Sequence, residues 1–172
     1  WLSPHGKSIL EKMDASVNRM ERLLDDILVL TRIHSDTNKE EDVDLNKIFK
    51  QAMDDMGEEI EQAGGIIHAD ELPAIKANAN QILYLFKNII SNAIKFQKRG
   101  VAPELSIKAE IVDGREVQTA IPAEEFLKLS FIDNGFGFDQ RYAKKIFHVF
   151  QRLHGKHEFE GTGGALAICK KV

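Results

Sequence analysis

The sequence predicts an α/β protein in which one long amphipathic helix precedes a domain of mixed helices and strands. Two observations predict this class. Residues 8–33 place apolar side chains at helical spacing. From residue 43 onward, helix-like and strand-like segments alternate, separated by Gly, Asp and Asn turn signals. With 43% apolar residues and four prolines, the composition is that of a globular protein with a well-formed core.

The first predicted element is a helix from Ser8 to Ile33. Most of its apolar residues fall on one stripe between charged residues; the apolar residues are Ile9, Met13, Val17, Met20, Leu24, Ile27, Leu28 and Val29. Such a stripe requires a partner, which we expect to be a second copy of the chain or a helix upstream of Trp1. The sequence therefore divides into a helical segment (1–34), a polar linker (35–42) and a second domain (43–172).

The second domain is predicted to begin with a short strand at Val43–Leu45. A helix follows and ends at Gly64-Gly65, and its apolar residues repeat every four positions: Ile48, Ala52, Met56 and Ile60. Extended segments are expected at residues 66–68 and 74–77. A strongly apolar helix is expected from about residue 80 to residue 96.

The remaining strands are predicted at residues 105–112, 116–121 and 127–132. The first two flank Asp113-Gly114, a dipeptide that suits a hairpin turn because it tolerates positive φ angles. After them we expect a short helix at 142–150, a glycine-bearing loop at 151–164, and the opening of a truncated helix at 165–172.

Composition argues against several classes of protein. A net charge of -4, from 23 basic and 27 acidic residues, gives no broad positive field for a nucleic acid. The single cysteine, Cys169, favours a reducing compartment such as the cytoplasm, because it has no second cysteine for a disulfide or a zinc site. No apolar run approaches about 20 residues, so we expect no membrane contact by this segment; membrane attachment of a longer parent protein stays open.

Three polar residues stand out on the helix at 80–96. Asn88, Asn92 and Lys95 follow the spacing i, i+4 and i+7, so they share one face of an otherwise apolar helix. Either this face lines a polar cavity or it is an exposed stripe. In the first case the amide oxygen of Asn92 is a hard ligand suited to Mg²⁺, while Lys95 faces a phosphate.

Two glycine-bearing segments offer further binding chemistry. In the run 133–139, glycines allow close approach of a flat ligand, and a buried Asp133 carboxylate accepts a hydrogen bond from an exocyclic amine. In the run 160–165, backbone N–H groups before a helix suit phosphates. Taken singly, each run is equally typical of an ordinary turn or loop.

Four segments in order resemble the nucleotide-binding boxes of one family. NIISNAIKF, DNGFGFD, KIFHVFQRLH and EGTGGALAICKK resemble the N, G1, F and G2 boxes of the histidine kinase catalytic domain, within the ATPase superfamily shared with gyrase and MutL. The resemblance covers about Val43 to Val172. It implies an α/β (α+β) sandwich, with a mixed, mostly antiparallel sheet backed by helices, that binds ATP and Mg²⁺.

The resemblance also assigns residues. It implies that Asn92 binds magnesium and that Asp133 recognises the adenine amino group. Asn88 and Lys95 line the phosphate side, and Gly135 and Gly137 form the floor of the base pocket. The remaining nucleotide-binding residues that it implies are Phe96, Gly161, Thr162 and Gly163, the last three at the end of a lid formed by residues 154–160.

The segment MERLLDDILVLTRI resembles the second helix of the family's dimerisation and phosphotransfer hairpin. This implies a homodimer through the N-terminal helix. The family's acceptor histidine lies on the first hairpin helix and precedes an acidic residue, whereas His5 here stands in Ser-Pro-His-Gly. We therefore expect the acceptor histidine to be absent from this chain and leave its catalytic residue unassigned. The implied partner is a response-regulator receiver domain, which receives the phosphoryl group on an aspartate.

One departure from the family pattern keeps a second hypothesis open. The G2 box usually reads Gly-Thr-Gly, an apolar residue and then Gly-Leu, whereas this chain has Gly164 and Ala165. The added methyl group suggests weakened contact with phosphate, and the alternative function is a pseudokinase that acts as a dimerisation scaffold. A gyrase-like or MutL-like ATPase is disfavoured because this chain has Asn88 where those enzymes place a catalytic glutamate.

Overall fold

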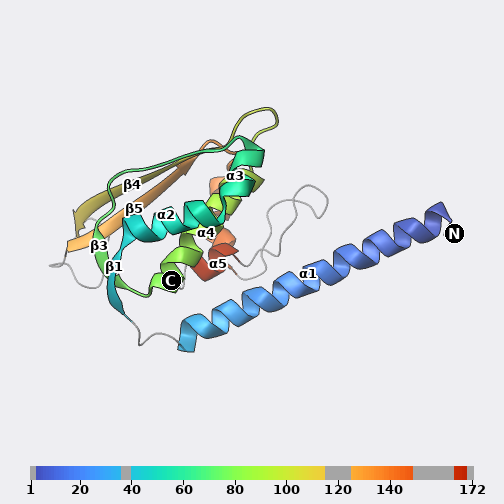
Figure 1. Cartoon of the computed structure of the whole chain (residues 1–172), viewed down its shortest axis with the longest axis horizontal. Helices are drawn as coiled ribbons and strands as arrows, with labels where there is room; N and C mark the ends of the chain where they lie inside the picture. Colours follow the sequence, from blue (N-terminus) through green and yellow to red (C-terminus); the bar gives the residue numbers. More distant parts are fainter. Residues whose placement is uncertain (1–2, 36–39, 115–124, 149–164, 170–172) are drawn as a thin grey trace. The chain divides into compact units, whose positions relative to one another are not determined.

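The computed structural model describes residues 3–35, 40–114, 125–148 and 165–169 (Figure 1). The chain divides into two compact units. One contains residues 39–137, and the other contains residues 1–38 together with residues 138–172. Each unit is described by itself below. None of the described helices combines the length and the apolar content that a membrane span requires.

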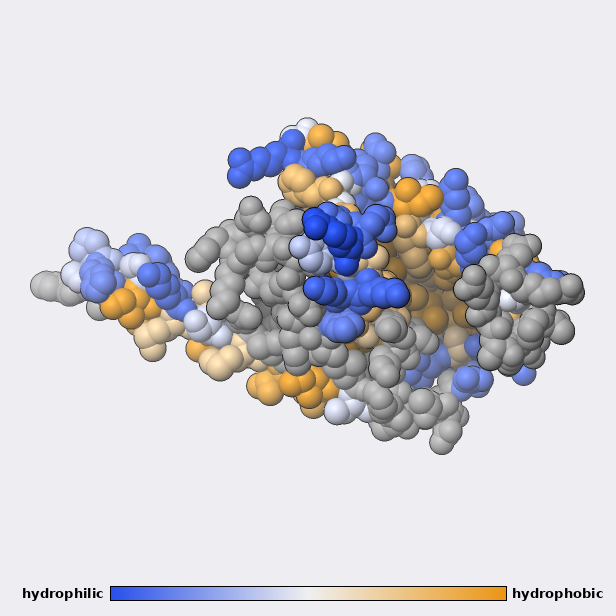
Figure 2. All heavy atoms as spheres, turned by 180° about the vertical axis from the view of Figure 1, so that it is seen from behind, coloured by the Kyte–Doolittle hydropathy of each residue, from blue (hydrophilic) through white to orange (hydrophobic). Residues whose placement is uncertain are grey.

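The first helix, α1, spans Pro4–Ser35 and slightly exceeds the prediction at both ends. Ser3 caps its start, since the Ser3 hydroxyl accepts a hydrogen bond from the Gly6 N–H at 3.1 Å. Pro4 suits the first helical position because it lacks the N–H that would be unsatisfied there. Apolar side chains along one side of α1 are exposed, with Met20 at 57% and Leu24 at 61% (Figure 2).

The unit of residues 39–137 begins with strand β1 (Glu41–Asp44) and helices α2 (Leu45–Asp55) and α3 (Gly57–Ala63). Asp44 starts α2 as its cap, because its carboxylate accepts from the Asn46 N–H at 3.0 Å. The prediction of a single helix up to Gly64 is wrong, because the helix is interrupted at Met56, between α2 and α3. Gly64, at φ 64°, ends α3 in the left-handed conformation.

The strands form a mixed arrangement in which two of the three described pairings are antiparallel. Strand β1 pairs with β3 (Ala74–Ala77) antiparallel, and β2 (Ile66–Ala69) pairs with β4 (Glu104–Asp113) parallel. Strand β5 (Glu125–Asp133) pairs antiparallel with β4 over its whole length, from Asp113↔Glu125 to Leu105↔Asp133. The predicted strand at residues 116–121 lies outside the described residues.

Helix α4 (Ala79–Lys95) provides the centre of the core. Its Phe86 is fully buried and meets Phe49 and Phe131 edge to face, with ring centroids 5.6 and 6.3 Å apart. In Figure 1, α2 and α4 lie on one side of β4 and β5. This two-layer packing of helices on a mixed sheet confirms the predicted sandwich.

The other unit holds the remaining described elements. Residues 140–147 form two short 3₁₀ turns, η1 (Gln140–Tyr142) and η2 (Lys145–Phe147), so the helix predicted at 142–150 is wrong over its described part. Asp139 favours the first turn because its carboxylate accepts from the Arg141 N–H at 2.9 Å. Helix α5 (Ala165–Cys169) contacts η2.

Candidate functional site

Helix α4 presents the three predicted polar residues on a half-buried face. Asn88, Asn92 and Lys95 are each partly covered, so the face is not a fully exposed stripe. The Asn88 side-chain N–H donates to the Tyr84 carbonyl at 3.0 Å. Among the described residues the Asn92 side chain has no hydrogen-bond partner. The Lys95 ammonium lies 4.7 Å from the centre of the Phe96 ring.

The run 133–137 forms a tight turn after β5. The Gly135 N–H donates to Asp133 Oδ1 at 2.8 Å, which fixes the orientation of the carboxylate. Gly137 adopts φ 65°, a conformation that favours glycine. The prediction that Asp133 is buried is wrong, because its side chain is exposed. Asp133 is the last residue of β5.

This turn, called here the G1 turn, packs directly on the end of α4. The Phe136 N–H donates to the Phe96 carbonyl at 3.0 Å. A Cβ on Gly135 would lie 2.7 Å from the Phe96 carbonyl oxygen and 2.7 Å from Asp133 Oδ1, too close for any side chain. The absence of a side chain at Gly135 therefore brings the amide-bearing helix and the carboxylate-bearing turn together.

Asn134 contributes a connection that the sequence analysis did not predict. Its side chain and backbone bond to residues 102–104 at the start of β4, as described below. Its position in the sequence could have indicated this connection. An asparagine directly after a strand offers both a hydrogen-bond donor and an acceptor, as a peptide group does.

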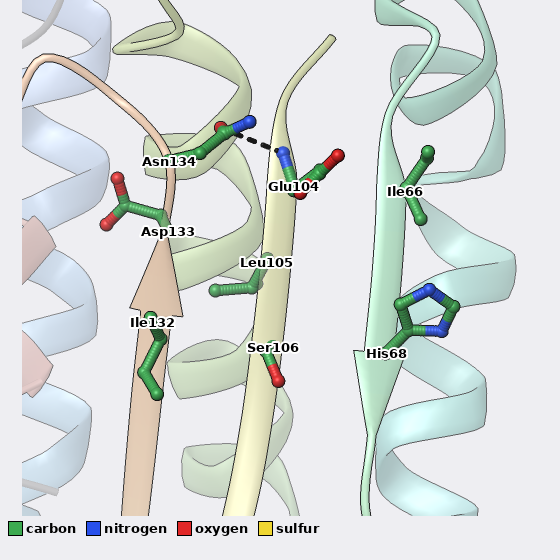
Figure 3. A pocket seen from close by; sticks show the side chains of 8 residues that line it. All are labelled: Ile66, His68, Glu104, Leu105, Ser106, Ile132, Asp133 and Asn134. Atoms are coloured by element: carbon green, nitrogen blue, oxygen red, sulfur yellow. Dashed lines mark hydrogen bonds between the residues drawn. The ribbon is translucent and has the colours of Figure 1, made fainter.

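A depression of about 360 Å³ lies on the sheet of β2, β4 and β5, on the face opposite to the one that packs against the helices (Figure 3). Its lining residues are Ile66, His68, Glu104, Leu105, Ser106, Ile132, Asp133 and Asn134. Ser106 and Ile132 are paired across β4 and β5, on the face opposite to the one that buries Ile107 against the helices. Of the predicted nucleotide residues that the structure describes, only Asp133 lines this depression; Asn88, Asn92 and Lys95 do not.

Other predicted features have different outcomes. Gly161, Thr162 and Gly163, and the lid at 154–160, lie outside the described residues. Burial raises the pKa of the Cys169 thiol to about 11, so this thiol stays protonated and is not a nucleophile at neutral pH. Among the residues that the structure describes, no three His, Cys, Asp or Glu side chains gather as a metal site. A metal ligand set built mainly from protein side chains is thus absent from that part.

Residues 77–172 match the family described as histidine kinase-, DNA gyrase B- and HSP90-like ATPase. This chain belongs to that family. It is 35% identical to cyanobacterial phytochrome A of a Nostoc species, over 91% of this chain and 19% of the relative. It is 32% identical to the phytochrome-like protein Cph1 of a Synechocystis species, over 99% of this chain and 21% of the relative.

Other relatives carry the name sensor-like histidine kinase. The family match and these relatives together identify the module as a catalytic domain of the sensor histidine kinase type. Because the family is one of ATPases, ATP is the nucleotide of this type of domain. The chain spans about a fifth of the length of the two phytochrome relatives.

Solved structures agree on the fold. Full-length ShkA, in complex with AMPPNP, matches with a TM-score of 0.66 at 22% identity, over 99% of this chain and 34% of that chain. The catalytic domain of the histidine kinase ThkA matches with a TM-score of 0.57 at 19% identity, over 77% of this chain and 78% of that chain. These similarities support the sandwich fold derived above.

Proposed function

We propose that this module binds Mg²⁺-ATP and transfers the γ-phosphoryl group to a histidine on a separate acceptor helix, for relay to a response-regulator aspartate. The observation that carries the proposal is the contact of Gly135 and Phe136 with the Phe96 carbonyl. This contact sets a base-recognising carboxylate beside a helix whose amides and lysine suit phosphates and a metal. The two ends of a nucleotide thus find chemically suitable groups on adjoining elements.

The donor chemistry of α4 fits magnesium. Mg²⁺ prefers oxygen ligands and keeps several waters and phosphate oxygens in its coordination shell, so one protein amide oxygen is enough. Asn92 supplies such an oxygen, and among the described residues its side chain is not engaged elsewhere. The bound ion would neutralise negative charge on the phosphates.

The protein's own contribution would be positioning and electrostatics. Asp133 Oδ1 is occupied by the Gly135 N–H, which leaves Oδ2 to accept from the adenine amine. Asn88 and Lys95 lie on the same helix face as Asn92 and would contact the phosphates. Holding the γ-phosphate in line with an incoming histidine nitrogen accounts for most of the catalysis in this type of reaction.

Three further parts of the proposal concern the surroundings of the site. The response-regulator receiver domain is the expected phosphoryl acceptor partner, α1 is the expected homodimer contact, and the cytoplasm is the expected compartment. The net charge of -4 supports a partner other than nucleic acid.

Calorimetric titration of ATP, with and without Mg²⁺, tests the site. We expect Asn92→Ala to weaken Mg²⁺-dependent ATP binding by roughly tenfold or more, because the metal loses its protein ligand. Asn80→Ala is the matched control, since Asn80 is an exposed asparagine in the first turn of the same helix. Equal affinities of the two variants would contradict the assignment of Asn92.

The same titration separates the alternatives. Increased affinity in Ala165→Gly would identify the departure at Gly164-Ala165 as the cause of weakened binding. No ATP binding by wild type or by any variant would overturn the kinase proposal and favour the dimerisation scaffold. Steady ATP hydrolysis by the isolated chain would instead favour a gyrase-like or MutL-like ATPase.

A further inference from the structure

Asn134 fastens the G1 turn to the start of β4 through three hydrogen bonds. Its side-chain Oδ1 accepts from the Glu104 N–H at 3.0 Å, and its Nδ2 donates to the Ala102 carbonyl at 3.0 Å. Its backbone N–H donates to the Glu104 carbonyl at 3.2 Å. The carboxamide therefore imitates a peptide group and extends the pairing of β4 and β5 beyond Leu105↔Asp133.

The anchor point at residues 102–104 is well held. Strand β4 lies between β2 and β5, and the Ile66 N–H donates to the Pro103 carbonyl at 2.8 Å. Pro103 is fully buried. Asn134 thus binds the G1 turn to the central strand of the sheet, which gives the turn a fixed reference.

Asp133 directly precedes Asn134, and the contact of Phe136 with the end of α4 follows two residues after Asn134. In Figure 3, the Asn134 side chain turns toward β4 while the Asp133 carboxylate turns away from it. Beyond Asn134, the Phe136 N–H donates to the Phe96 carbonyl at 3.0 Å, which holds the far end of the G1 turn. The Gly135 N–H occupies Asp133 Oδ1, so these bonds together determine the direction of Oδ2.

We propose that Asn134 is a positioning residue for purine recognition: by fixing the G1 turn to β4, it holds Asp133 Oδ2 where the exocyclic amine of adenine donates. The inference rests on the proposed function. Adenine presents an N–H donor to this oxygen, whereas guanine presents a carbonyl acceptor at the same ring position. A carboxylate fixed in place discriminates between the two, whereas a carboxylate free to move would accommodate both.

The test compares ATP with purine riboside triphosphate, which differs from ATP only by lacking the exocyclic amine. We expect wild type to prefer ATP by about tenfold or more, because only ATP makes the hydrogen bond to Asp133. In Asn134→Ala, the preference should fall to within about twofold, while the affinity for purine riboside triphosphate changes little. Asn134→Ser, whose hydroxyl replaces one of the two side-chain bonds, should give an intermediate preference.

Asn46→Ala is the matched control for stability. Like Asn134, Asn46 makes two hydrogen bonds from its side chain to the backbone. Its Oδ1 accepts from the Leu72 N–H at 3.0 Å, and its Nδ2 donates to the Leu72 carbonyl. We expect this variant to lower Tm and to keep the full preference for ATP. Circular dichroism establishes folding of each variant.

The outcomes are distinguishable. An Asn134→Ala or Asn134→Ser protein that is folded, has a lowered Tm and keeps the wild-type preference would show that Asn134 is merely structural. A wild type that binds neither nucleotide would overturn the proposed function, and the inference about Asn134 with it. A wild type that binds both nucleotides equally would overturn the role of Asp133 Oδ2 in base recognition, and the inference about Asn134 with it, while the binding of Mg²⁺-ATP by this module would stand.

Discussion

Gly135 lies where the main chain of the G1 turn passes the last carbonyl of α4. Gly135 does not adopt a positive φ angle. Glycine is required there because a side chain would collide with neighbouring atoms. Both atoms that a Cβ would approach to 2.7 Å have little freedom to move. One is the Phe96 backbone oxygen and the other is the Asp133 carboxylate oxygen, which the Gly135 N–H holds.

We expect Gly135→Ala to lower the free energy of unfolding by about 1–3 kcal/mol, because the helix end and the turn must separate to admit the methyl group. Gly57→Ala is the control: Gly57 lies in α3 and has no atom within 4 Å of its Cβ position. Helix propensity predicts that this control gains up to about 1 kcal/mol. Urea denaturation measures both values. Equal stability of the two variants would refute the packing argument.

Sequence reasoning found part of the site. The helical spacing of Asn88, Asn92 and Lys95 was enough to predict a shared face, and the structure half-buries that face. The exposure of Asp133 was not predictable, because burial at the end of a strand depends on which other elements of the fold cover it. Asn134 was missed for a similar reason: its partners, Ala102 and Glu104, are distant in sequence.

At the scale of elements, α4 connects the site to the core. Its buried side carries Phe86, which packs against Phe49 of α2 and Phe131 of β5, while its other side carries Asn92. The position of the amide face therefore depends on aromatic packing on the opposite side of the helix.

We expect Phe86→Ala to lower the free energy of unfolding by about 3–5 kcal/mol, since it removes both edge-to-face contacts and leaves a cavity. Phe86→Leu should lose less because it fills more of the volume. Ile132→Ala, at a side chain that is 52% exposed, should cost less than about 1 kcal/mol. Equilibrium urea unfolding ranks the three, and a loss in Phe86→Ala no larger than that in Ile132→Ala would contradict this description of the core.

The predictions of secondary structure were wrong where the local sequence pattern did not determine the structure. The apolar repeat at Ile48, Ala52, Met56 and Ile60 continues through the interruption between α2 and α3, so periodicity alone could not locate it. Gly57, directly after the interruption, was the overlooked signal. The Asp113-Gly114 turn signal likewise could not show that β5 pairs over its whole length with β4, because strand partners depend on the whole sheet.

At the scale of the whole molecule, the apolar stripe of α1 is largely exposed, although α1 also contacts α5. The helix is about 48 Å long for its 32 residues, and its exposed apolar side chains recur along that length. A stripe of this length and spacing is typical of a helical bundle contact, which supports the predicted homodimer.

We expect wild type to be a dimer and Met20→Glu/Leu24→Glu to be a monomer, because the paired charges would lie in the apolar contact. Ala15→Glu/Asn18→Glu adds the same charge on the opposite side of α1 and should remain dimeric. Size-exclusion chromatography with light scattering measures both masses. A monomeric wild type, or dissociation of both variants, would argue against the stripe as the dimer contact.

The bond between Phe136 and Phe96 joins segments that are far apart along the chain and that meet only when β5 lies beside β4 and α4 packs on the sheet. Neither segment alone holds both the amide face and the carboxylate. The unfolded ensemble therefore contains no complete copy of the site, and any nucleotide that requires both parts binds the native state alone. Its binding energy is added in full to the stability of the fold by mass action.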